Sequence, residues 1–214
     1  MAFRAYNKIT NEIIDIDYWL KEHFQDRPYC PICGEVTDIK AKSSVEIKTH
    51  FAHPKGSECP SIEENHENYS LRSPVERDSD NAEKLIKWVK VNPYFLYKKC
   101  KELLDGFLKY QEFAELLNKA DENQVWYYKG LTKEVLPYVL FVNHGTFPKI
   151  NGCREERVYF IFDKNLYGDD LFLQKEITHI WKIRPDYYFD KIEISFNTHG
   201  SAPEYVWNYI RHFY

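Results

Sequence analysis

The chain has 214 residues, which is enough for one ordinary domain or for a small module attached to a modest one. Hydrophobic residues make up 43% of the sequence and charged residues 29%, so the composition excludes bulk disorder. The net charge of −4 excludes a protein that coats nucleic acid with its whole surface, and the short apolar runs exclude a membrane-spanning helix. We expect a folded cytoplasmic protein that does not enter a membrane, in which any contact with nucleic acid is a local patch.

The sequence begins with a predicted β-hairpin. Residues 2–17 alternate around a polar turn at 7–12 and then reach a β-branched run at 13–16. Candidate metal ligands follow within 18–60. The polar stretch Glu63–Asp80 comes after them and has no apolar periodicity. We therefore place a boundary near 70–80 and treat 1–70 as one module.

Helical signals dominate the middle of the chain. Asp80 has the position of a helix N-cap, and Asn92-Pro93 is typical of the start of a second helix. The second helix is expected to continue through Leu108, and a third is expected over 111–119. We assign 75–130 to a helical segment.

Beyond residue 130 the pattern changes to β-branched and aromatic runs between Gly, Pro, Asn and Asp clusters. We expect a small sheet closed by a C-terminal helix over about 203–212, and we assign 131–214 to an α+β domain. The predicted strands are Val135–Val142, Arg157–Phe162, Ile177–Ile183 and Lys191–Phe196. The predicted fold is of the α+β class, with an N-terminal hairpin module, a central helical segment and a C-terminal sheet with a terminal helix.

The strongest chemical signal is a set of cysteines and histidines in the first module. Cys30 and Cys33 are separated by two residues, and His50, His53 and Cys59 follow. A Cys-x-x-Cys turn places both thiolates on one ion, and a second pair completes a tetrahedron, so the pattern predicts a structural zinc site. Five candidates compete for four places. Two histidines three residues apart in an extended segment point to opposite faces, so either His50 or His53 is expected to be surplus. We favour His53 with Cys59.

The N-terminal region also resembles a known family. The segment AYNKIT at 5–10, the CPIC at 30–33, the THFAH at 49–53 and the trailing Cys59 are similar to the zinc-finger region of competence CoiA-like proteins, over roughly residues 3–60. The resemblance implies a bacterial or phage-borne protein connected with DNA uptake, processing or defence. It also implies zinc ligands at Cys30, Cys33, His53 and Cys59. Members of that family continue into a restriction-endonuclease-like domain, whose acidic residue and Glu-x-Lys pattern are not found in 75–214.

A lysine-rich segment interleaved with aromatic residues is the main candidate for contact with nucleic acid. Between residues 84 and 101 there is no acidic residue. Lysines on one face could neutralise phosphates while an aromatic ring stacks on an unpaired base. The alternative is an ordinary amphipathic helix with its aromatic side chains in the core. The candidate residues are Lys84, Lys87, Trp88, Lys90, Lys98, Lys99 and Lys101.

Three sets of acidic residues are candidates for a catalytic site. Glu46-Ile47-Lys48 with Asp38 upstream imitates a nuclease signature, but it lies inside the zinc loop, where a solvated face is the simpler interpretation. The second set follows a predicted strand and could bind a divalent ion: Asp163, Asp169 and Asp170. The third set follows the zinc module and consists of His66 with Glu64 and Glu67.

The sequence favours a role without catalysis. We expect a zinc-stabilised nucleic-acid-binding or adaptor protein in bacterial DNA processing, phage biology or defence, with DNA, RNA or another protein as its partner. A diverged metal-dependent nuclease is one alternative. The other is a protein-interaction subunit that does not bind nucleic acid, because tyrosine and tryptophan are favoured at interface hot spots.

Overall fold

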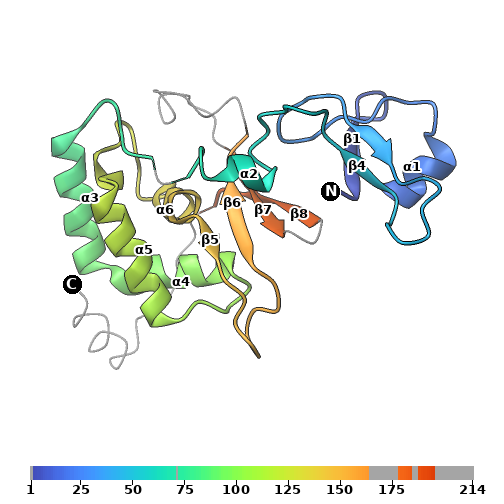
Figure 1. Cartoon of the computed structure of the whole chain (residues 1–214). Helices are drawn as coiled ribbons and strands as arrows, with labels where there is room; N and C mark the ends of the chain where they lie inside the picture. The colour runs from blue at the N-terminus through green and yellow to red at the C-terminus, as the bar shows by residue number, and fades with distance from the viewer. Residues whose placement is uncertain (1, 71, 164–177, 185–187, 196–214) are drawn as a thin grey trace.

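The computed structural model describes residues 2–70, 72–163, 178–184 and 188–195, and its fold is mixed α+β, as predicted (Figure 1). The described residues form small antiparallel sheets and six α-helices, which are joined by turns and loops. None of the described helices is long and apolar enough to cross a membrane. The predicted C-terminal helix over 203–212 lies outside the described residues.

The predicted N-terminal hairpin is confirmed. Strand β1 (Arg4–Asn7) pairs antiparallel with β2 (Glu12–Asp15), and the turn between them contains Asn11 with a φ of 62°. The β-branched run ends earlier than the sequence indicated, because helix α1 (Ile16–Glu22) begins at Ile16. Asp15 caps this helix by accepting a hydrogen bond from the backbone N–H of Asp17 at 3.0 Å.

A second small sheet completes the module. Strands β3 (Asp38–Lys40) and β4 (His50–Ala52) pair antiparallel, and the short helix α2 (Glu63–His66) follows them. Ala2 joins Phe51 through two backbone hydrogen bonds, so the hairpin and β4 are tied together. The buried side chains of this part form one cluster: Ala5, Ile14, Ile16, Trp19 and Phe51.

The middle of the chain is helical, as predicted. The helices are α3 (Ser79–Val91), α4 (Pro93–Leu103) and α5 (Tyr110–Glu122), followed by a 3-10 turn, η1 (Val125–Tyr127). The cap of α3 is Asp78, not Asp80, because the Asp78 side chain accepts from the backbone N–H of Asn81. Asn92 stands at the N-cap position of α4 and Pro93 in its first turn, as predicted, but the Asn92 amide donates to the carbonyl of Trp88 and makes no capping bond. The helix ends at Leu103, so the prediction that it continues through Leu108 is wrong.

The prediction of a strand over Val135–Val142 is wrong, since this segment forms helix α6 (Leu136–His144). All nine residues of α6 are buried, so the helix shows no alternation between polar and apolar residues. A short apolar run without such a period is equally compatible with a buried strand and a buried helix. The deciding feature is Pro137 in the first turn, where a proline favours the start of a helix.

The C-terminal sheet lies between two hydrophobic cores. Its strands are β5 (Thr146–Phe147), β6 (Val158–Ile161), β7 (His179–Arg184) and β8 (Tyr188–Glu193), each antiparallel to the next. Alternate residues of β6 face opposite sides, so Phe160 packs with the helices while Tyr159 and Ile161 pack with the module. Both faces of the sheet are therefore covered, which explains why every residue of β6 is buried.

One buried histidine gives the helical core a dependence on pH. The His144 ring stacks on Phe147 with ring centroids 4.4 Å apart, and burial lowers the pKa of His144 from 6.5 to about 3, with smaller effects from Lys119 and Arg154. The unfolded chain therefore takes up this proton first as the pH falls. The free energy of unfolding should decrease from about pH 6.5 downward, by about 1.4 kcal/mol per pH unit.

We expect the substitution His144→Phe, which keeps an aromatic ring and removes the titration, to abolish this part of the pH dependence. Urea unfolding at about pH 7.5 and about pH 5.5 measures it. Between about pH 7.5 and about pH 5.5, the free energy of unfolding should decrease by about 1 kcal/mol more in the wild type than in the variant. An equal loss in both proteins would contradict the assignment to His144.

Candidate metal centre

Four side chains of the N-terminal module come together around one point. The potential ligand atoms of Cys30, Cys33, His53 and Cys59 all lie within 4.8 Å of one another. The sulfurs of Cys30 and Cys59 are 3.8 Å apart, and the sulfur of Cys33 is 3.5 Å from Nε2 of His53. These four residues are close enough to hold a metal ion.

The distances agree with a tetrahedron around an ion of the size of zinc. Usual bond lengths of about 2.3 Å to sulfur and about 2.0–2.1 Å to nitrogen give tetrahedral edges of about 3.8 Å between two sulfurs and about 3.5 Å between sulfur and nitrogen. The two distances above match these edges. Four protein ligands fill such a site, so the arrangement leaves no position for a reacting water.

The first two ligands belong to a tight turn. The backbone N–H of Gly34 donates to the carbonyl of Cys30 at 2.9 Å, and the backbone N–H of Ile32 approaches the sulfur of Cys30 at 3.4 Å. Gly34 has a φ of 71°, a conformation that residues with a Cβ rarely adopt. The sequence C-P-I-C-G therefore turns the chain so that both sulfurs face the same point.

The third ligand follows strand β4, and the structure separates the two histidines of this segment. His53 lies among the three cysteines, whereas His50, at the start of the strand, bonds through Nδ1 to the backbone carbonyl of Lys48 at 2.8 Å. His50 is outside the group of four. This arrangement agrees with the expectation that the pair of histidines would not both reach one ion.

The fourth ligand is held by a layer of polar contacts. Oγ of Ser61 lies 3.0 Å from the sulfur of Cys59, and the Asn65 amide donates to the carbonyls of Ser57 and Cys59. The Tyr159 hydroxyl, from strand β6, donates to the carbonyl of Ser61 at 2.9 Å. The loop that carries Cys59 is therefore fixed by helix α2 and by the C-terminal sheet.

The sequence did not reveal this supporting layer. Tyr159 lies 98 residues after Ser61, and neither residue belongs to a motif. Asn65 falls in a polar stretch that we interpreted only as a boundary. No local signal in the sequence could identify these contacts, because they depend on how the sheet packs against the module.

The thiols of Cys30 and Cys59 do not ionise together. Hydrogen bonds from Cys30 and Cys33 lower the pKa of the Cys59 thiol well below its ordinary value, because they stabilise its thiolate. The pKa of Cys30 is raised by its hydrogen bonds with Cys33 and Cys59 and by burial. Of these two thiols, Cys59 is therefore favoured as the thiolate, and a divalent cation would stabilise a second thiolate at Cys30.

The structure divides the lysine-rich segment into exposed and buried parts. Lys84, Lys87 and Lys90 are exposed on α3, on the side away from its buried residues. Trp88 is half-buried and packs against the helical core. In α4, Lys101 is exposed and Lys98 is half-buried.

Lys99 does not belong to the exposed surface. Its side chain is only 10% exposed, and its Nζ lies 3.4 Å from the Glu102 carboxylate and 3.4 Å from the Ser195 hydroxyl. A buried and paired lysine cannot reach a phosphate without breaking these contacts. The sequence-based inclusion of Lys99 in a nucleic-acid surface is therefore wrong.

The carboxylate candidates are scattered. Glu46 and Lys48 lie in an exposed loop between β3 and β4, and Asp38 is paired with Lys40. Asp163 accepts a hydrogen bond from the Trp181 indole N–H at 2.5 Å, while Asp169 and Asp170 lie outside the described residues. Within the described residues, the only group of potential metal ligands is the one around Cys30.

His66 is buried beside the module but is not part of the cluster. Its ring packs on Tyr159 with centroids 4.1 Å apart, and burial lowers the pKa of His66 to about 4. Neither ring nitrogen has a hydrogen-bond partner among the described residues. The neighbouring Glu64 and Glu67 are exposed, so the three residues do not converge on one site.

Comparison with protein-family models, with curated proteins and with solved structures found no match for this chain.

Proposed function

We propose that the chain is a zinc-stabilised protein that binds nucleic acid and does not catalyse a reaction. The observation that carries this proposal is the group of Cys30, Cys33, His53 and Cys59, in which the Cys30–Cys59 and Cys33–His53 distances match tetrahedral edges. Three thiolates and one imidazole are the ligands of structural zinc sites. A filled coordination sphere supports a role in holding the fold rather than in chemistry.

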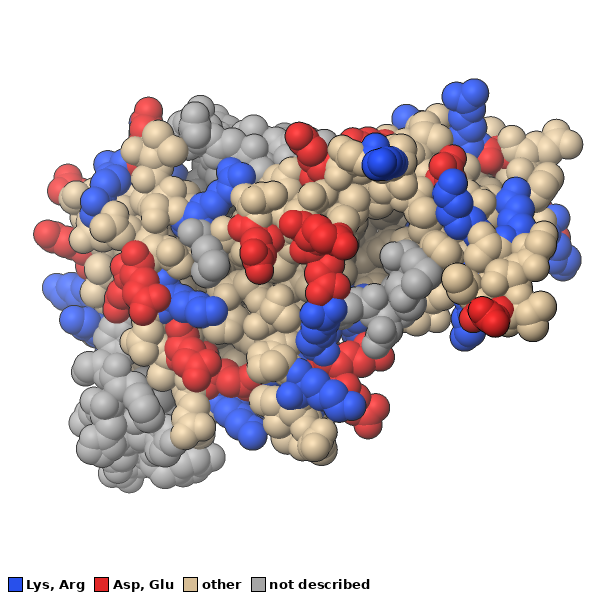
Figure 2. All heavy atoms as spheres, in the orientation of Figure 1, with Lys and Arg blue, Asp and Glu red and all other residues tan. Residues whose placement is uncertain are grey.

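The row of lysines on α3 supports contact with nucleic acid. Lys84, Lys87 and Lys90 repeat every three residues, and all three are exposed. Basic and acidic side chains are interspersed on the face that Figure 2 shows, so this face has no continuous basic surface. The proposed contact with nucleic acid is therefore confined to the α3 lysines. Each lysine would neutralise a phosphate and release a counterion, which makes binding sensitive to salt.

The resemblance of residues 3–60 to CoiA-like zinc fingers supports a place in bacterial or phage DNA processing or defence. Under this proposal the module serves as a positioning element and not as a nuclease. A second candidate, an adaptor for another protein, is favoured by exposed apolar side chains in the module. These are Ile9, Ile13, Tyr18, Phe24, Val36, Val45 and Ile47.

We expect the affinity for nucleic acid to fall steeply with salt, and the triple variant Lys84→Glu, Lys87→Glu, Lys90→Glu to flatten this dependence. Removing about three phosphate contacts should lower the slope of log K against log[salt] by about 3. Titrations of single-stranded DNA, double-stranded DNA and RNA at several salt concentrations measure the slope.

A matched triple variant controls for net charge. Lys55, Lys133 and Lys149 are exposed elsewhere on the molecule, and their replacement by glutamate makes the same change in total charge. The slope of this control should stay close to that of the wild type. If none of the three nucleic acids binds at about 50 mM salt, where attraction is least screened, the adaptor function takes the place of the proposal.

A further inference from the structure

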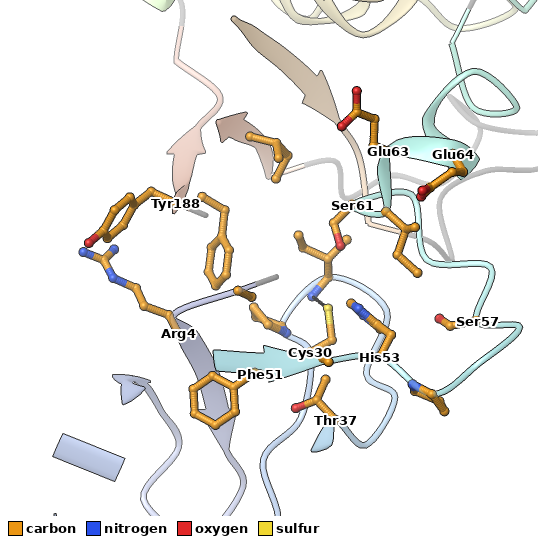
Figure 3. Close-up of a pocket in the computed structure, with 18 of the residues that line it drawn as sticks. Arg4, Cys30, Thr37, Phe51, His53, Ser57, Ser61, Glu63, Glu64 and Tyr188 are labelled. Atoms are coloured by element: carbon orange, nitrogen blue, oxygen red, sulfur yellow. Dashed lines mark hydrogen bonds between the residues drawn. The ribbon is translucent and has the colours of Figure 1, made fainter. Parts of the chain in front are cut away.

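A cavity lies between the metal centre and the C-terminal sheet (Figure 3). Its volume is about 500 Å³, within the range of about 300–1,000 Å³ that is typical of small-molecule sites. Cys30 and His53 line one wall, so the cavity shares two residues with the metal centre. The remaining walls come from β1, the segment 31–37, β4, the segment 54–64, β6 and the ends of β7 and β8.

One end of the cavity carries a cation and an exposed aromatic ring. The Arg4 guanidinium lies 5.8 Å from the centre of the Tyr188 ring, and Tyr188 is 44% exposed. Among the described residues Arg4 has no carboxylate partner, since its recorded contact is with this ring. Arg184 also lines the cavity, paired with Asp190 at 2.8 Å. An anionic group is therefore favoured at the Arg4 end.

Part of the cavity wall is apolar. Ile62, Ile183 and Phe189 line it and belong to the cluster between the module and the sheet. The Phe51 ring also borders the cavity but packs edge-on against Trp19 in the core of the module. Such a wall favours the flat, apolar face of a ring over a chain of charged groups. The Tyr188 ring contacts Phe3 and the Arg4 guanidinium, and the residue is still exposed, so part of its ring remains accessible for a base to stack on.

The opposite end of the cavity is acidic, which sets the direction of a bound ligand. Figure 3 shows Glu63 and Glu64 on the far side of the cavity from Arg4 and Tyr188. Glu63 is neutralised by Arg157 at 2.5 Å, so Glu64 supplies most of the negative charge. A phosphate is repelled from this end and attracted to the Arg4 end.

We propose that this cavity binds a nucleoside monophosphate unit, with the base along the apolar wall and Tyr188 and the phosphate at Arg4. The same chemistry is offered by a free nucleotide and by the 5′-phosphorylated end of a single strand. The inference rests on the proposed function in one respect, because a strand end in the cavity would extend the contact made by the α3 lysines.

Isothermal titration with AMP, adenosine and inorganic phosphate tests the proposal on the full, metal-loaded chain. AMP should bind with saturation, and adenosine should bind about tenfold more weakly because it lacks the contact with Arg4. Arg4→Gln should weaken AMP about tenfold and leave adenosine unchanged. Tyr188→Leu should weaken both ligands, whereas Tyr188→Phe, which keeps the ring, should bind like the wild type.

Two further variants keep the test decisive. Lys8→Ala removes a cation that lies over the Tyr29 ring outside the cavity, so it should bind AMP like the wild type. Arg4→Lys keeps the charge if Arg4→Gln fails to fold. Saturable AMP binding that is unaffected by the Arg4 and Tyr188 variants, or no AMP binding at millimolar concentration, would overturn the proposal.

Oligonucleotides separate the two sources of the ligand and the two proposals. A 5′-phosphorylated strand that binds more tightly than its 5′-hydroxyl counterpart, with the difference lost in Arg4→Gln, identifies the strand end as the ligand. AMP binding without this difference identifies the free nucleotide. The triple lysine variant on α3 should bind AMP like the wild type. If this variant loses strand binding, the α3 surface is identified, whereas loss of AMP binding in the Arg4 variant identifies the cavity.

Discussion

The substitution Cys59→Ser should remove the bound zinc and unfold the N-terminal module. Cys59 is fully buried, and its sulfur is 3.8 Å from that of Cys30, so the substitution removes one of the four converging ligand atoms. Metal binding supplies much of the stability of such a small module, and its loss should cost on the order of 4 kcal/mol or more. In a chain of this length that loss lowers the melting temperature by roughly 10 °C.

Elemental analysis and thermal unfolding of the same preparations measure this result. The wild type, purified without added metal, should contain one zinc per chain. Cys153→Ser is the matched control, because Cys153 is half-buried and outside the group of four. The ligand assignment is wrong if Cys59→Ser keeps a full complement of zinc and an unchanged melting curve.

The second large effect is expected at a buried ion pair. Arg154 donates to the carboxylate of Glu112 at 2.5 Å, and their side chains are only 7% and 12% exposed. Arg154 also donates through Nε to the carbonyl of Pro148, so it joins helix α5 to the segment before β6. Glu112→Leu leaves a buried guanidinium without its counterion, which should cost about 3–5 kcal/mol.

The double variant Glu112→Leu, Arg154→Met tests whether the cost comes from the stranded charge. It should recover most of the lost stability in urea unfolding, because an apolar pair of similar size avoids burying a lone cation. Glu76→Leu is the exposed control, since Glu76 pairs with Lys129 at the surface, and it should leave the unfolding midpoint nearly unchanged. A double variant no more stable than Glu112→Leu would contradict this interpretation.

The sequence predicted the group of candidate metal ligands because these residues follow local rules. The turn at Cys30–Cys33 is encoded within five residues, and strand alternation predicts that His50 and His53 face opposite sides, although it does not decide which of them is the ligand. The helices α3, α4 and α5 were also predicted, since their caps and their apolar period are local signals. Even there, the cap of α3 shifted from Asp80 to Asp78, because either aspartate satisfies the sequence rule.

Features that depend on distant packing could not be predicted. Helix α6 has no amphipathic period because it is surrounded by the core, so its apolar run resembled a strand. The cavity at Arg4 and Tyr188 brings together residues from the two ends of the described chain. The burial of Lys99 depends on Glu102 and on Ser195, and the second of these is 96 residues away.

The position of the C-terminal sheet between two cores bears on the order in which the chain folds during synthesis. The helices α3 to α6 make contacts that are close in sequence, so they can form soon after they leave the ribosome. Ile32 and Ile62 must wait for Ile183 and Phe189, which are synthesised more than a hundred residues later. Until then the module has an uncovered apolar face, and a metal ion acquired early would keep this nascent segment compact while its partner strands are still being made.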